Sequence, residues 1–421
     1  MDLCQRLAAQ TVGQVLAGRN LSQLLEELWR SQPRLTPQQR AMTQEYSYGT
    51  LRHLGLLRAL LDRLVDRPLQ DEHVRCLLLV GLYQLEYGTA AAHAVVDHAV
   101  RAAAHFRKPW AKGLVNAVLR NFLRRREGLL ESLAGDEMAR YSYPQWWIGK
   151  LRVQYPQQWQ SMLEAGNQRP PLTLRVNRRQ GGDDAYQQRL NAVGIAAHAL
   201  GGDAVMLQQP LPVDQLPGFA DGAVSVQDSG AQQAALLLDV HDGMRVLDAC
   251  CAPGGKTGHL LELAELRMTA LDSDAARIAR TRDNLARLRL AAEFKVGDAG
   301  EPAGWWDGVP YQRILADVPC SASGIVRRHA DIKWLRREQD LAGFAAQQAR
   351  ILRSLWQLLE KGGKLLYATC SVFVEENQSQ IDAFLHEQAD ARQLPIPGLT
   401  GGQLLPCAEH DGFFYALLQK V

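Results

Sequence analysis

The stretch Val246-Leu-Asp-Ala-Cys-Cys-Ala-Pro-Gly-Gly-Lys-Thr-Gly258 decides the fold of the C-terminal half of this chain. Two apolar residues lead into an acidic one, a Pro-Gly-Gly turn follows, and residues 259–264 have the pattern of a helix. A strand, a glycine-rich turn and a helix in this order open a nucleotide-binding α/β domain. The glycines allow the backbone to approach a ligand closely, because they carry no Cβ.

The turn fits neither of the two common phosphate-binding patterns. A P-loop needs Gly-x-x-x-x-Gly-Lys-Thr, but position 250, where the first glycine would fall, is cysteine. A dinucleotide turn needs Gly-x-Gly-x-x-Gly, and no register of residues 253–258 gives that pattern. A ligand with a carboxylate and a ribose but no phosphate fits better, and S-adenosylmethionine is such a ligand. The alternative is a tight strand-to-helix turn without a ligand.

Length and composition indicate an ordinary globular protein of several domains. The chain has 421 residues, 47% hydrophobic and 22% charged, so we expect two or three domains. The net charge is only +2, and any nucleic-acid binding must therefore rest on local patches. The first residues lack a signal-peptide pattern, and no apolar run reaches the ~18 residues of a membrane span. We expect a cytoplasmic protein that does not bind membranes.

The seven cysteines indicate free thiols. Their number is odd and no C-x-x-C pair occurs, so we expect neither disulfides nor a structural zinc site, and no other metal. Individual cysteines are then available for chemistry.

Residues 1–135 have the pattern of an all-helical bundle. Apolar residues recur at helical spacing, and Thr36-Pro37 is a favourable helix start with a capping threonine. The predicted helices cover residues 3–16, 21–28, 38–64, 74–87, 95–106 and 112–126.

One stretch of this bundle is strongly basic. Residues 101–126 carry eight Lys or Arg and no acid, with three aromatic residues between them. Such a pattern suits a phosphate backbone and unstacked bases, and it makes Arg120 and Arg124 candidate RNA contacts. A solvated helix face with core aromatics explains the run equally well.

Residues 140–225 predict a small α/β module. An aromatic helix is expected from Tyr141 to Leu163, then a strand over 170–177, a helix near 184–193 and two short strands. If the strand alternates, Arg175 and Asn177 point away from its apolar face. Arg175 is therefore a candidate RNA contact, although a plain exposed strand is an equal alternative.

Strands and helices alternate from residue 226 to residue 421. This pattern predicts a doubly wound, mostly parallel sheet, and ligands bind such sheets beyond the carboxyl ends of the strands. Four carboxylates, Asp248, Asp272, Asp298 and Asp317, fall at predicted strand ends. Asp272 is placed to accept both hydroxyls of a ribose, and Asp298 to accept an adenine amino group. A lone aspartate after a strand is usually a turn former, but several at successive strand ends favour a site.

Two cysteines also follow strands of this sheet. Cys320 lies in Asp317-Val-Pro-Cys-Ser-Ala-Ser-Gly324, and Cys370 lies in Tyr367-Ala-Thr-Cys-Ser371. A single cysteine is usually a small buried apolar residue. Two at the same sheet edge are better explained as paired reactive thiols. Cys4, Cys76 and Cys407 are expected to be structural.

These motifs together resemble a known family. Cys250-Cys-Ala-Pro-Gly-Gly-Lys256, Asp317-Val-Pro-Cys-Ser321 and Ala368-Thr-Cys-Ser371 are similar to the motifs of RNA 5-methylcytosine methyltransferases. Gln44-Glu-Tyr-Ser-Tyr-Gly-Thr-Leu-Arg52 and Lys112-Gly-Leu-Val-Asn-Ala-Val-Leu-Arg120 resemble NusB-type RNA-binding domains. Nearly the whole chain is similar to the bacterial enzymes that methylate a cytosine of 16S rRNA. The departure from the family pattern is small: the turn reads Cys-Cys-Ala-Pro where Cys-Ala-Ala-Pro is expected.

The resemblance implies the fold class and the site. We expect a multidomain protein with an N-terminal all-α NusB-like bundle (1–135), a small α/β module (140–225) and a C-terminal α/β Rossmann-like S-adenosylmethionine-dependent methyltransferase domain (226–421). The partner is 16S rRNA, and the protein is expected to be a monomer. The implied cofactor-binding residues are Cys250, Cys251, Ala252, Pro253, Gly254, Gly255, Lys256, Asp272, Asp298 and Asp317.

The resemblance also implies three catalytic roles. Cys370 attacks carbon 6 of cytosine as a thiolate, which turns carbon 5 into a carbanion equivalent. Asp317, either protonated or sharing a proton with the base, stabilises the adduct at ring nitrogen 3, and burial is expected to raise its pKa. Cys320 assists removal of the carbon-5 proton and release of the product. A free cysteine has a pKa of ~8.5, so Cys370 needs a nearby positive charge or a helix N-terminus to ionise, and Lys256 or the sulfonium of the cofactor is the candidate.

The segment after Cys320 is basic and predicts RNA contacts. Residues 324–337 follow the proposed site directly, and Trp334 is placed to stack on a base or to pack in the core. The candidate phosphate contacts here are Arg327, Arg328, Lys333 and Arg336. A solvated loop is the alternative. For the whole chain, tRNA methylation and a non-catalytic RNA-binding factor on a methyltransferase fold stay open.

Overall fold

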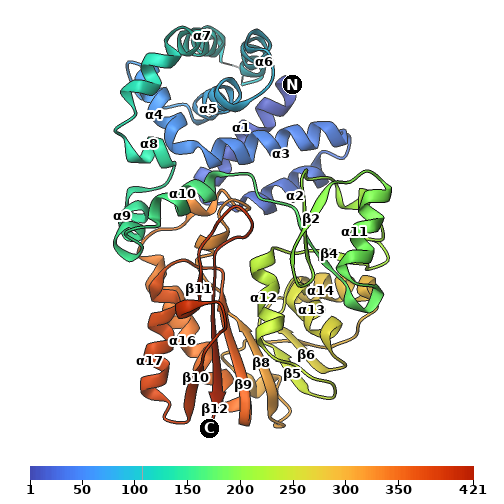
Figure 1. Ribbon diagram of the computed structural model, residues 1–421. Coiled ribbons are helices and arrows are strands. Elements are labelled where there is room, and N and C mark those ends of the chain that lie inside the picture. Colours follow the sequence, from blue (N-terminus) through green and yellow to red (C-terminus); the bar gives the residue numbers. More distant parts are fainter. Residues whose placement is uncertain (107) are drawn as a thin grey trace. The chain divides into compact units, whose positions relative to one another are not determined.

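The computed structural model describes residues 1–106 and 108–421, without the side chains of Pro109 and Thr400 (Figure 1). Arg107, one of the eight basic residues of the stretch 101–126, lies outside the described residues. The chain forms two compact units. Unit 1 consists of Met1–Gln168 and Val326–Glu338, and unit 2 consists of Arg169–Ile325 and Gln339–Val421.

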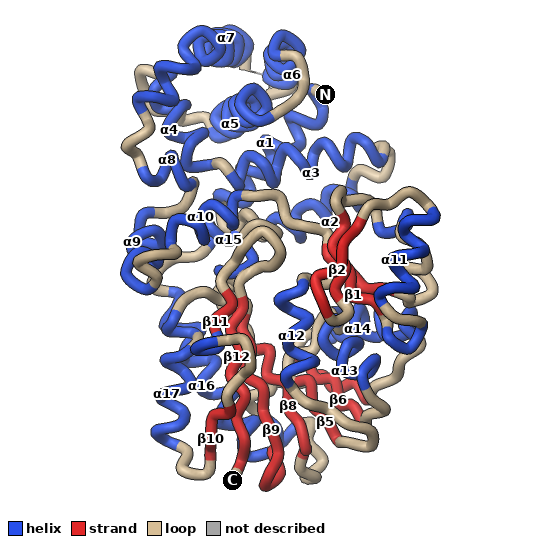
Figure 2. Tube along the Cα trace, viewed as in Figure 1, coloured by secondary structure: helices blue, strands red, loops and turns tan. Residues whose placement is uncertain are grey.

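Unit 1 is built from helices (blue in Figure 2). Its helices are α1 (Asp2–Leu16), α2 (Leu21–Ser31), α3 (Pro37–Arg52), α4 (Leu54–Leu64), α5 (Glu72–Tyr87), α6 (Ala92–Ala104), α7 (Pro109–Ser132), α8 (Glu137–Tyr141), α9 (Gln145–Gln154), α10 (Trp159–Asn167) and α15 (Ile332–Leu335). Residues 76–84 of α5 are buried on all sides, so this helix forms the centre of the bundle. The predicted cap is confirmed, because the Thr36 hydroxyl accepts the Gln39 N–H and the Gln39 side chain accepts the Thr36 N–H.

Two predicted helices of unit 1 are divided in the structure. The helix expected over residues 38–64 ends at Arg52 and restarts at Leu54, and the aromatic helix expected from Tyr141 is replaced by α8, α9 and α10. Ser142, with φ 52°, ends α8, and Pro144 stands directly before α9. These three helices lie in unit 1, whose first segment extends to residue 168.

The segment Val326–Glu338 is distant in sequence from the rest of unit 1 but packs inside it. The Lys333 ammonium donates hydrogen bonds to the Arg52 carbonyl and to Oδ1 of Asn167, both at 2.7 Å. The Trp334 indole donates to the Leu51 carbonyl at 2.7 Å, and Oδ2 of Asp331 accepts the first N–H of α2. The segment is therefore held by directed hydrogen bonds to several helices.

Unit 2 contains a small antiparallel sheet with strand order β2-β3-β1-β4. Its elements are β1 (Thr173–Val176), η1 (Arg178–Gln180), α11 (Asp183–Ala192), β2 (Ala197–Gly201), β3 (Ala204–Leu207), η2 (Val213–Gln215) and β4 (Val224–Val226). Residues 224–226, at the predicted boundary between the small module and the C-terminal domain, pair with β1. All four residues of β1 are buried, so both faces of this strand are covered.

The large sheet of unit 2 has the order β10-β12-β9-β8-β5-β6-β7, with β11 paired to β12. The strands are β5 (Arg245–Asp248), β6 (Arg267–Asp272), β7 (Glu293–Val296), β8 (Tyr311–Asp317), β9 (Leu359–Thr369), β10 (Ala391–Leu394), β11 (Gln403–Leu404) and β12 (Phe413–Lys420). The pairs from β7 to β9 are parallel, whereas β12 is antiparallel to both β9 and β10. The predicted doubly wound, mostly parallel sheet is confirmed.

Helices cover both faces of the large sheet. They are α12 (Ser229–Leu237), α13 (Gly255–Leu263), α14 (Ala275–Leu288), α16 (Asp340–Leu358) and α17 (Gln378–Glu387), with short 3-10 turns η3 (Pro302–Gly304), η4 (Ser323–Ile325), η5 (Val374–Glu376) and η6 (Thr400–Gly402). Helices α12, α13 and α14 share one apolar core with Val246 of β5, whereas α16 and α17 share the other with Leu247. The sheet order reverses at β5, because β6 and β8 lie on its two sides. Ligands of such folds bind beyond the carboxyl ends of the strands at this point.

Candidate active site

The glycine turn between β5 and α13 has the geometry that close approach of a ligand requires. Gly254 has φ 89°, and a Cβ at this position would lie 2.7 Å from Cγ2 of Thr281. Gly254 also stands at the N-cap of α13, and no side chain caps this helix. The first N–H groups of α13 are therefore available to a carboxylate ligand.

Asp248, at the end of β5, brings a buried carboxyl group to this turn. Its side chain is 1% exposed, and Oδ2 accepts the hydroxyl of Thr257 at 2.7 Å. Among the described residues, Oδ1 has no hydrogen-bond partner. Burial raises the pKa of Asp248 to about 7, against the lowering effect of the Thr257 hydrogen bond. An unsatisfied buried oxygen next to an open helix N-terminus fits a ligand that carries both an ammonium and a carboxylate group.

Asp272 and Asp298 lie at the ends of the next two strands, as predicted, but both already have partners. Asp272 is 2% exposed and accepts the N–H groups of Ala252 and Asp274 at 3.2 and 3.1 Å. It therefore ties the glycine turn to β6. Asp298 is more exposed: Oδ1 accepts the N–H of Gly300, and Oδ2 binds Arg350 at 2.7 Å.

Lys256 and Asp317 form an ion pair at the ends of β5 and β8. Nζ of Lys256 lies 2.6 Å from Oδ2 of Asp317. Burial disfavours the Lys256 ammonium, but the Asp317 carboxylate and, to a smaller extent, the charge of Cys370 outweigh this effect and raise the lysine pKa. Asp317 is thus paired with a cation, and its role at the ring nitrogen of the base stays a prediction.

The two candidate catalytic cysteines are in contact. Sγ of Cys320 lies 3.4 Å from Sγ of Cys370. The pairing of β8 with β9 causes this proximity. Asp317 lies opposite Ala368, and each of the two strands continues into a short loop that carries a cysteine. The loops are joined by a hydrogen bond from the Gly324 N–H to the Cys370 carbonyl at 2.8 Å. Both cysteine residues are half-buried.

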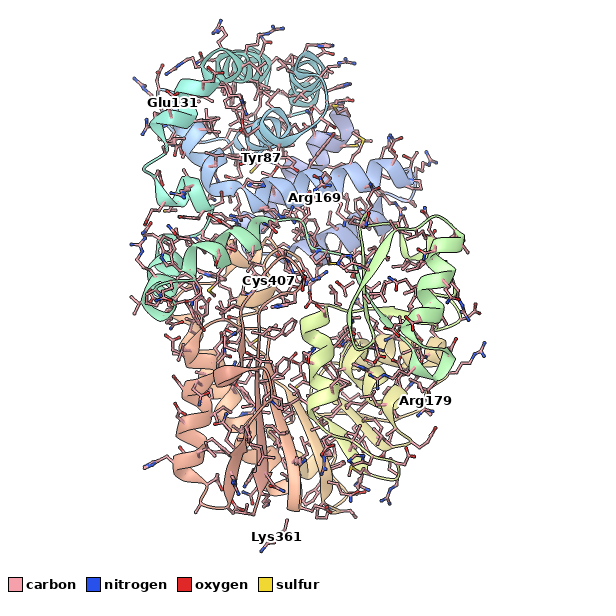
Figure 3. The ribbon with its side chains drawn as sticks, viewed as in Figure 1. Tyr87, Glu131, Arg169, Arg179, Lys361 and Cys407 are labelled. Atoms are coloured by element: carbon pink, nitrogen blue, oxygen red, sulfur yellow. The ribbon has the colours of Figure 1, made fainter. Side chains whose placement is uncertain are left out.

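The other five cysteines lie in the glycine turn, in the core of unit 1 or in the loop before β12. Burial raises the pKa of Cys250 and of Cys251 above the ordinary cysteine value, and neighbouring aspartates raise it further. Cys4 and Cys76 are buried in the helical core of unit 1, and Cys407 lies in the loop before β12 (Figure 3). Cys320 also has a raised pKa, caused first by its hydrogen bond to Cys370, then by burial, the charge of Cys370 and the charge of Glu376.

The sequence did not single out Glu376, which binds both cysteine loops. Its carboxylate accepts the N–H of Ser321 at 2.7 Å and the hydroxyls of Ser321 and Ser371 at 2.5 Å each. These serines directly follow Cys320 and Cys370. The acid stands six residues after Cys370, at the first residue of the helix expected over residues 376–387, and only its complete burial and its hydrogen bonds show that it is part of the site.

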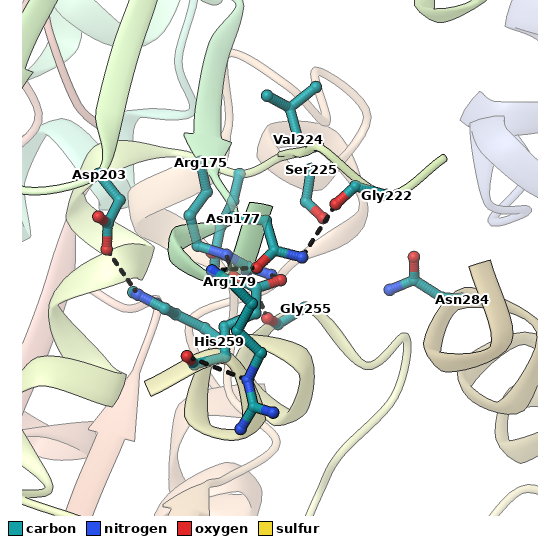
Figure 4. A network of polar contacts seen from close by, with 12 residues as sticks. Arg175, Asn177, Arg179, Asp203, Gly222, Val224, Ser225, Gly255, His259 and Asn284 are labelled. Atoms are coloured by element: carbon teal, nitrogen blue, oxygen red, sulfur yellow. Dashed lines mark hydrogen bonds and ion pairs between the residues drawn. The ribbon is translucent and has the colours of Figure 1, made fainter. Parts of the chain in front are cut away.

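Arg175 is placed differently from the prediction. Its guanidinium is completely buried and donates two hydrogen bonds to Glu262 of α13, at 2.8 and 2.7 Å, and one to the Gly255 carbonyl at 2.7 Å. The predicted RNA contact of Arg175 is therefore wrong, because α13 covers this face of β1. Figure 4 shows Arg175 within a polar network that also contains Arg179 and His259.

This network extends along α13. Arg179 donates to the carbonyls of Glu262 and Ala264 at 3.4 and 3.0 Å, and His259 lies 3.6 Å from Asp203 (Figure 4). Burial lowers the pKa of His259 to about 4. Residues of the small sheet and of its connecting segments thus contact α13 from Gly255, the first residue of the helix, to the C-terminal end of the helix.

The remaining RNA candidates separate into buried and exposed groups. Lys333 and Arg327 are at most 1% exposed, and Lys333 is bound to acceptors of unit 1, so the predicted phosphate contacts of these two side chains do not fit the structure. Arg328 and Arg336 are half-buried. Arg120 and Arg124 of α7 are exposed, and Arg124 lines a cavity of about 770 Å³ together with Arg63, Arg125 and Arg126.

Within the part of the chain that the structure describes, no cluster of three His, Cys, Asp or Glu side chains could hold a metal ion. No helix in the described ranges is long and apolar enough to cross a membrane.

The doubly wound sheet, the glycine turn after β5 and the carboxylates at successive strand ends define a methyltransferase domain of the S-adenosylmethionine-dependent class. The buried oxygen of Asp248 and the open N-terminus of α13 fit the amino acid part of this cofactor, and the ribose contact of Asp272 stays a prediction.

Comparisons with known proteins identify the family. Residues 235–419 match the family model described as 16S rRNA methyltransferase RsmB/F, residues 143–214 match the RsmF/B-like ferredoxin-like domain, and residues 4–124 match the NusB family. "Ribosomal RNA small subunit methyltransferase B" of Pseudomonas syringae pv. tomato is 44% identical and covers 98% of this chain and 96% of its own length. The protein of the same name from Serratia proteamaculans is 45% identical and covers 99% and 98%. The chain therefore belongs to the RsmB/F methyltransferase family.

A solved structure confirms the fold over the whole chain. The crystal structure of PH0851 aligns with a TM-score of 0.81 at 22% identity, covering 100% of this chain and 99% of its own. The predicted fold class is confirmed: a NusB-like helical region, a small ferredoxin-like module and a C-terminal methyltransferase domain.

Proposed function

We propose that this enzyme methylates carbon 5 of a cytosine in 16S rRNA through a covalent adduct with Cys370. The observation that carries the proposal is the 3.4 Å contact between Cys320 and Cys370, which lie on the same sheet edge as the ion pair of Lys256 and Asp317. Two thiols at this edge match a reaction in which one attacks the base and the other assists release. The names of the relatives support rRNA as the substrate.

The chemistry of cytosine requires a nucleophile. Carbon 5 is too weakly nucleophilic to take a methyl group directly, but addition of the Cys370 thiolate to carbon 6 forms a sulfur–carbon bond and an enamine whose carbon 5 is reactive. S-Adenosylmethionine supplies the electrophilic methyl group. The Lys256–Asp317 pair is proposed to bind ring nitrogen 3, where it shares a proton with the base and stabilises the charge of the adduct.

Release restores the aromatic ring. The carbon-5 proton passes to solvent water, the carbon 5–carbon 6 double bond re-forms, and the bond between Cys370 and carbon 6 breaks with its electron pair on sulfur. The raised pKa of Cys320, caused first by its hydrogen bond to Cys370, keeps it a thiol at neutral pH. Cys320 is therefore proposed to donate a hydrogen bond to the departing sulfur, and its assistance in removal of the carbon-5 proton stays a prediction.

The RNA-binding part of the proposal rests on α7. Arg120, Arg124 and Arg125 are exposed on this helix, and Arg124 and Arg125 line the basic cavity. A concave basic surface suits the phosphate backbone of RNA.

A direct experiment tests the reaction. Deproteinised small-subunit rRNA from a strain that lacks the gene is incubated with the enzyme and methyl-labelled S-adenosylmethionine, then digested to nucleosides. Label in 5-methylcytidine supports the proposal. Label in another nucleoside, or label only when tRNA replaces rRNA, overturns the position or the substrate respectively.

A further inference from the structure

The buried carboxylate of Glu376 is bound to both loops that carry a cysteine. Oε1 accepts the N–H of Ser321 at 2.7 Å, and Oε2 accepts the hydroxyls of Ser321 and Ser371 at 2.5 Å each. The side chain is 0% exposed. In such an interior, hydrogen bonds to a charged acceptor are short and strong, and removing the acceptor leaves several buried donors without a partner.

Further contacts fix Glu376 from two other sides. The Gln348 amide of α16 donates to Oε1 of Glu376 at 3.1 Å and to the Pro319 carbonyl at 2.9 Å. The Tyr367 hydroxyl donates to the Glu376 carbonyl at 2.7 Å. Pro319 and Ser321 flank Cys320, so this network holds the cysteine from both of its neighbours.

A hydroxyl cluster completes the connection between the loops. The Ser323 hydroxyl lies 3.0 Å from that of Ser371 and accepts the Val372 N–H at 2.9 Å. The Ser321 and Ser371 hydroxyls lie 3.2 Å apart. Because hydroxyls are both donors and acceptors, the fixed acceptors of Glu376 determine the direction of these bonds.

We propose that Glu376 is the positioning residue of the two-cysteine site: its carboxylate holds the loops of Cys320 and Cys370 together and thereby fixes the two thiols in contact. The proposal rests on the proposed function only for its catalytic consequence, because the geometry itself can be tested without RNA or cofactor.

The charge of Glu376 also acts differently on the two cysteines, which are proposed to serve as nucleophile (Cys370) and hydrogen-bond donor (Cys320). It is one of the causes that raise the pKa of Cys320, after the hydrogen bond to Cys370, burial and the charge of Cys370. Cys370 instead interacts with the ammonium of Lys256. Glu376 therefore favours Cys320 as the hydrogen-bond donor and leaves Cys370 as the nucleophile.

The rate of oxidation by diamide tests whether the two thiols are held close together. Both thiols lose their hydrogens to the azo group of diamide, which is reduced to the hydrazine, and a sulfur–sulfur bond of about 2.05 Å forms. The rate at which this disulfide forms is followed by mass spectrometry of the Cys320–Cys370 peptide pair. It reports how often the loops bring the two sulfur atoms together. We expect rapid formation in the wild type, because only a short movement closes the gap of 3.4 Å.

Three substitutions separate geometry from charge and from nonspecific effects. Glu376→Ala is expected to slow disulfide formation at least tenfold, and Glu376→Gln, which keeps the shape but loses the charge, to have a smaller effect. Glu387→Gln, an exposed glutamate of α17 paired with Arg353, is the matched control and should react like the wild type. If Glu376→Ala does not fold, Ser321→Ala removes one hydroxyl bound to Oε2 and is expected to slow the reaction two- to fivefold.

Kinetics give the second measurement. Glu376→Ala should lower kcat at least tenfold with KM for S-adenosylmethionine within twofold, since the hydrogen bonds described for Glu376 go to the cysteine loops, Gln348 and Tyr367 and not to the glycine turn. Wild-type disulfide formation in a folded Glu376→Ala or Ser321→Ala protein overturns the proposal, and so does a wild type that forms no such bond. Failure of the proposed function is recognised separately, as absence of labelled 5-methylcytidine with the wild-type enzyme.

Discussion

The guanidinium of Arg175 binds the carboxylate of Glu262 through two hydrogen bonds of 2.8 and 2.7 Å, and both side chains are at most 2% exposed. A third bond, to the Gly255 carbonyl, reaches the first residue of α13. The small sheet of unit 2 is thus bound to the helix that begins at the glycine turn. The ferredoxin-like module therefore holds the helix that follows the glycine turn.

Arg175→Met should destabilise the enzyme and weaken binding of S-adenosylmethionine. Removing one partner leaves Glu262 charged and buried, which costs about 3–5 kcal/mol in the free energy of unfolding. Urea unfolding and calorimetric titration of the cofactor measure the two effects. Arg178→Met is the control, because the Arg178–Asp203 pair is half-exposed at the arginine and should contribute below about 1 kcal/mol. Equal stability of the two variants would contradict the role of Arg175 in holding α13.

Cys370→Ser should abolish methylation and form no covalent complex with RNA. A serine hydroxyl is a far weaker nucleophile than a thiolate, so the rate is expected to fall by about a hundredfold or more. Single-turnover methylation of rRNA measures the loss. A variant that methylates at near wild-type rate would exclude Cys370 as the nucleophile.

Cys320→Ala should instead accumulate a protein–RNA adduct. Without the thiol that lies 3.4 Å from Cys370, the departing sulfur loses its hydrogen-bond donor and release slows. The adduct survives SDS and is seen as a band of lower mobility on a denaturing gel. Cys407→Ala, which changes a cysteine outside the site, should release RNA normally, and a Cys320→Ala enzyme without the band would argue against the release role.

The sequence predicted those parts of the site that depend on local pattern. The glycine turn and Cys320 and Cys370 were placed correctly at strand ends, because strand–turn–helix units and parallel pairing are encoded locally. Arg175 was misplaced because alternation along a strand shows which side chains share a face, but not that a helix covers that face. Glu376 and Lys333 were missed or misassigned for a related reason: their buried partners are distant in sequence, and only the folded chain brings them together.

Substitution of Arg124 and Arg125 in α7 should weaken RNA binding in a salt-dependent manner. Each phosphate contact that is lost should reduce the slope of log K against log salt concentration by about one unit. Filter binding of 16S rRNA fragments at several salt concentrations measures the slope. Arg19→Ala is the control, because Arg19 is also exposed but pairs with Glu27 outside the basic cavity. An unchanged slope in the Arg124→Ala/Arg125→Ala variant would place the RNA elsewhere.

Binding of S-adenosylmethionine should release a proton from Asp248. Burial raises the pKa of this carboxyl group to about 7, the charge of Asp317 adds to the effect, and Thr257 and Lys256 oppose it. The ammonium of the cofactor favours the ionised carboxylate, so the bound state has a lower pKa than the free state. Affinity should therefore rise about tenfold between pH 5.5 and pH 7, since each unit below the pKa of the free enzyme adds about a tenfold cost of ionisation.

In the enzyme without the cofactor, a rise in pH has the opposite effect: it lowers the free energy of unfolding. The unfolded carboxyl group ionises near its ordinary value of 3.8, whereas the folded group holds its proton until about pH 7. The free energy of unfolding is therefore reduced progressively between these two values, and the loss is complete above pH 7.

Calorimetric titration of the enzyme with S-adenosylmethionine at pH 6, in two buffers of different ionisation enthalpy, measures the proton released on cofactor binding. Asp248→Asn removes the ionisable group and should abolish the release; the same proton release in this variant would assign it to another residue.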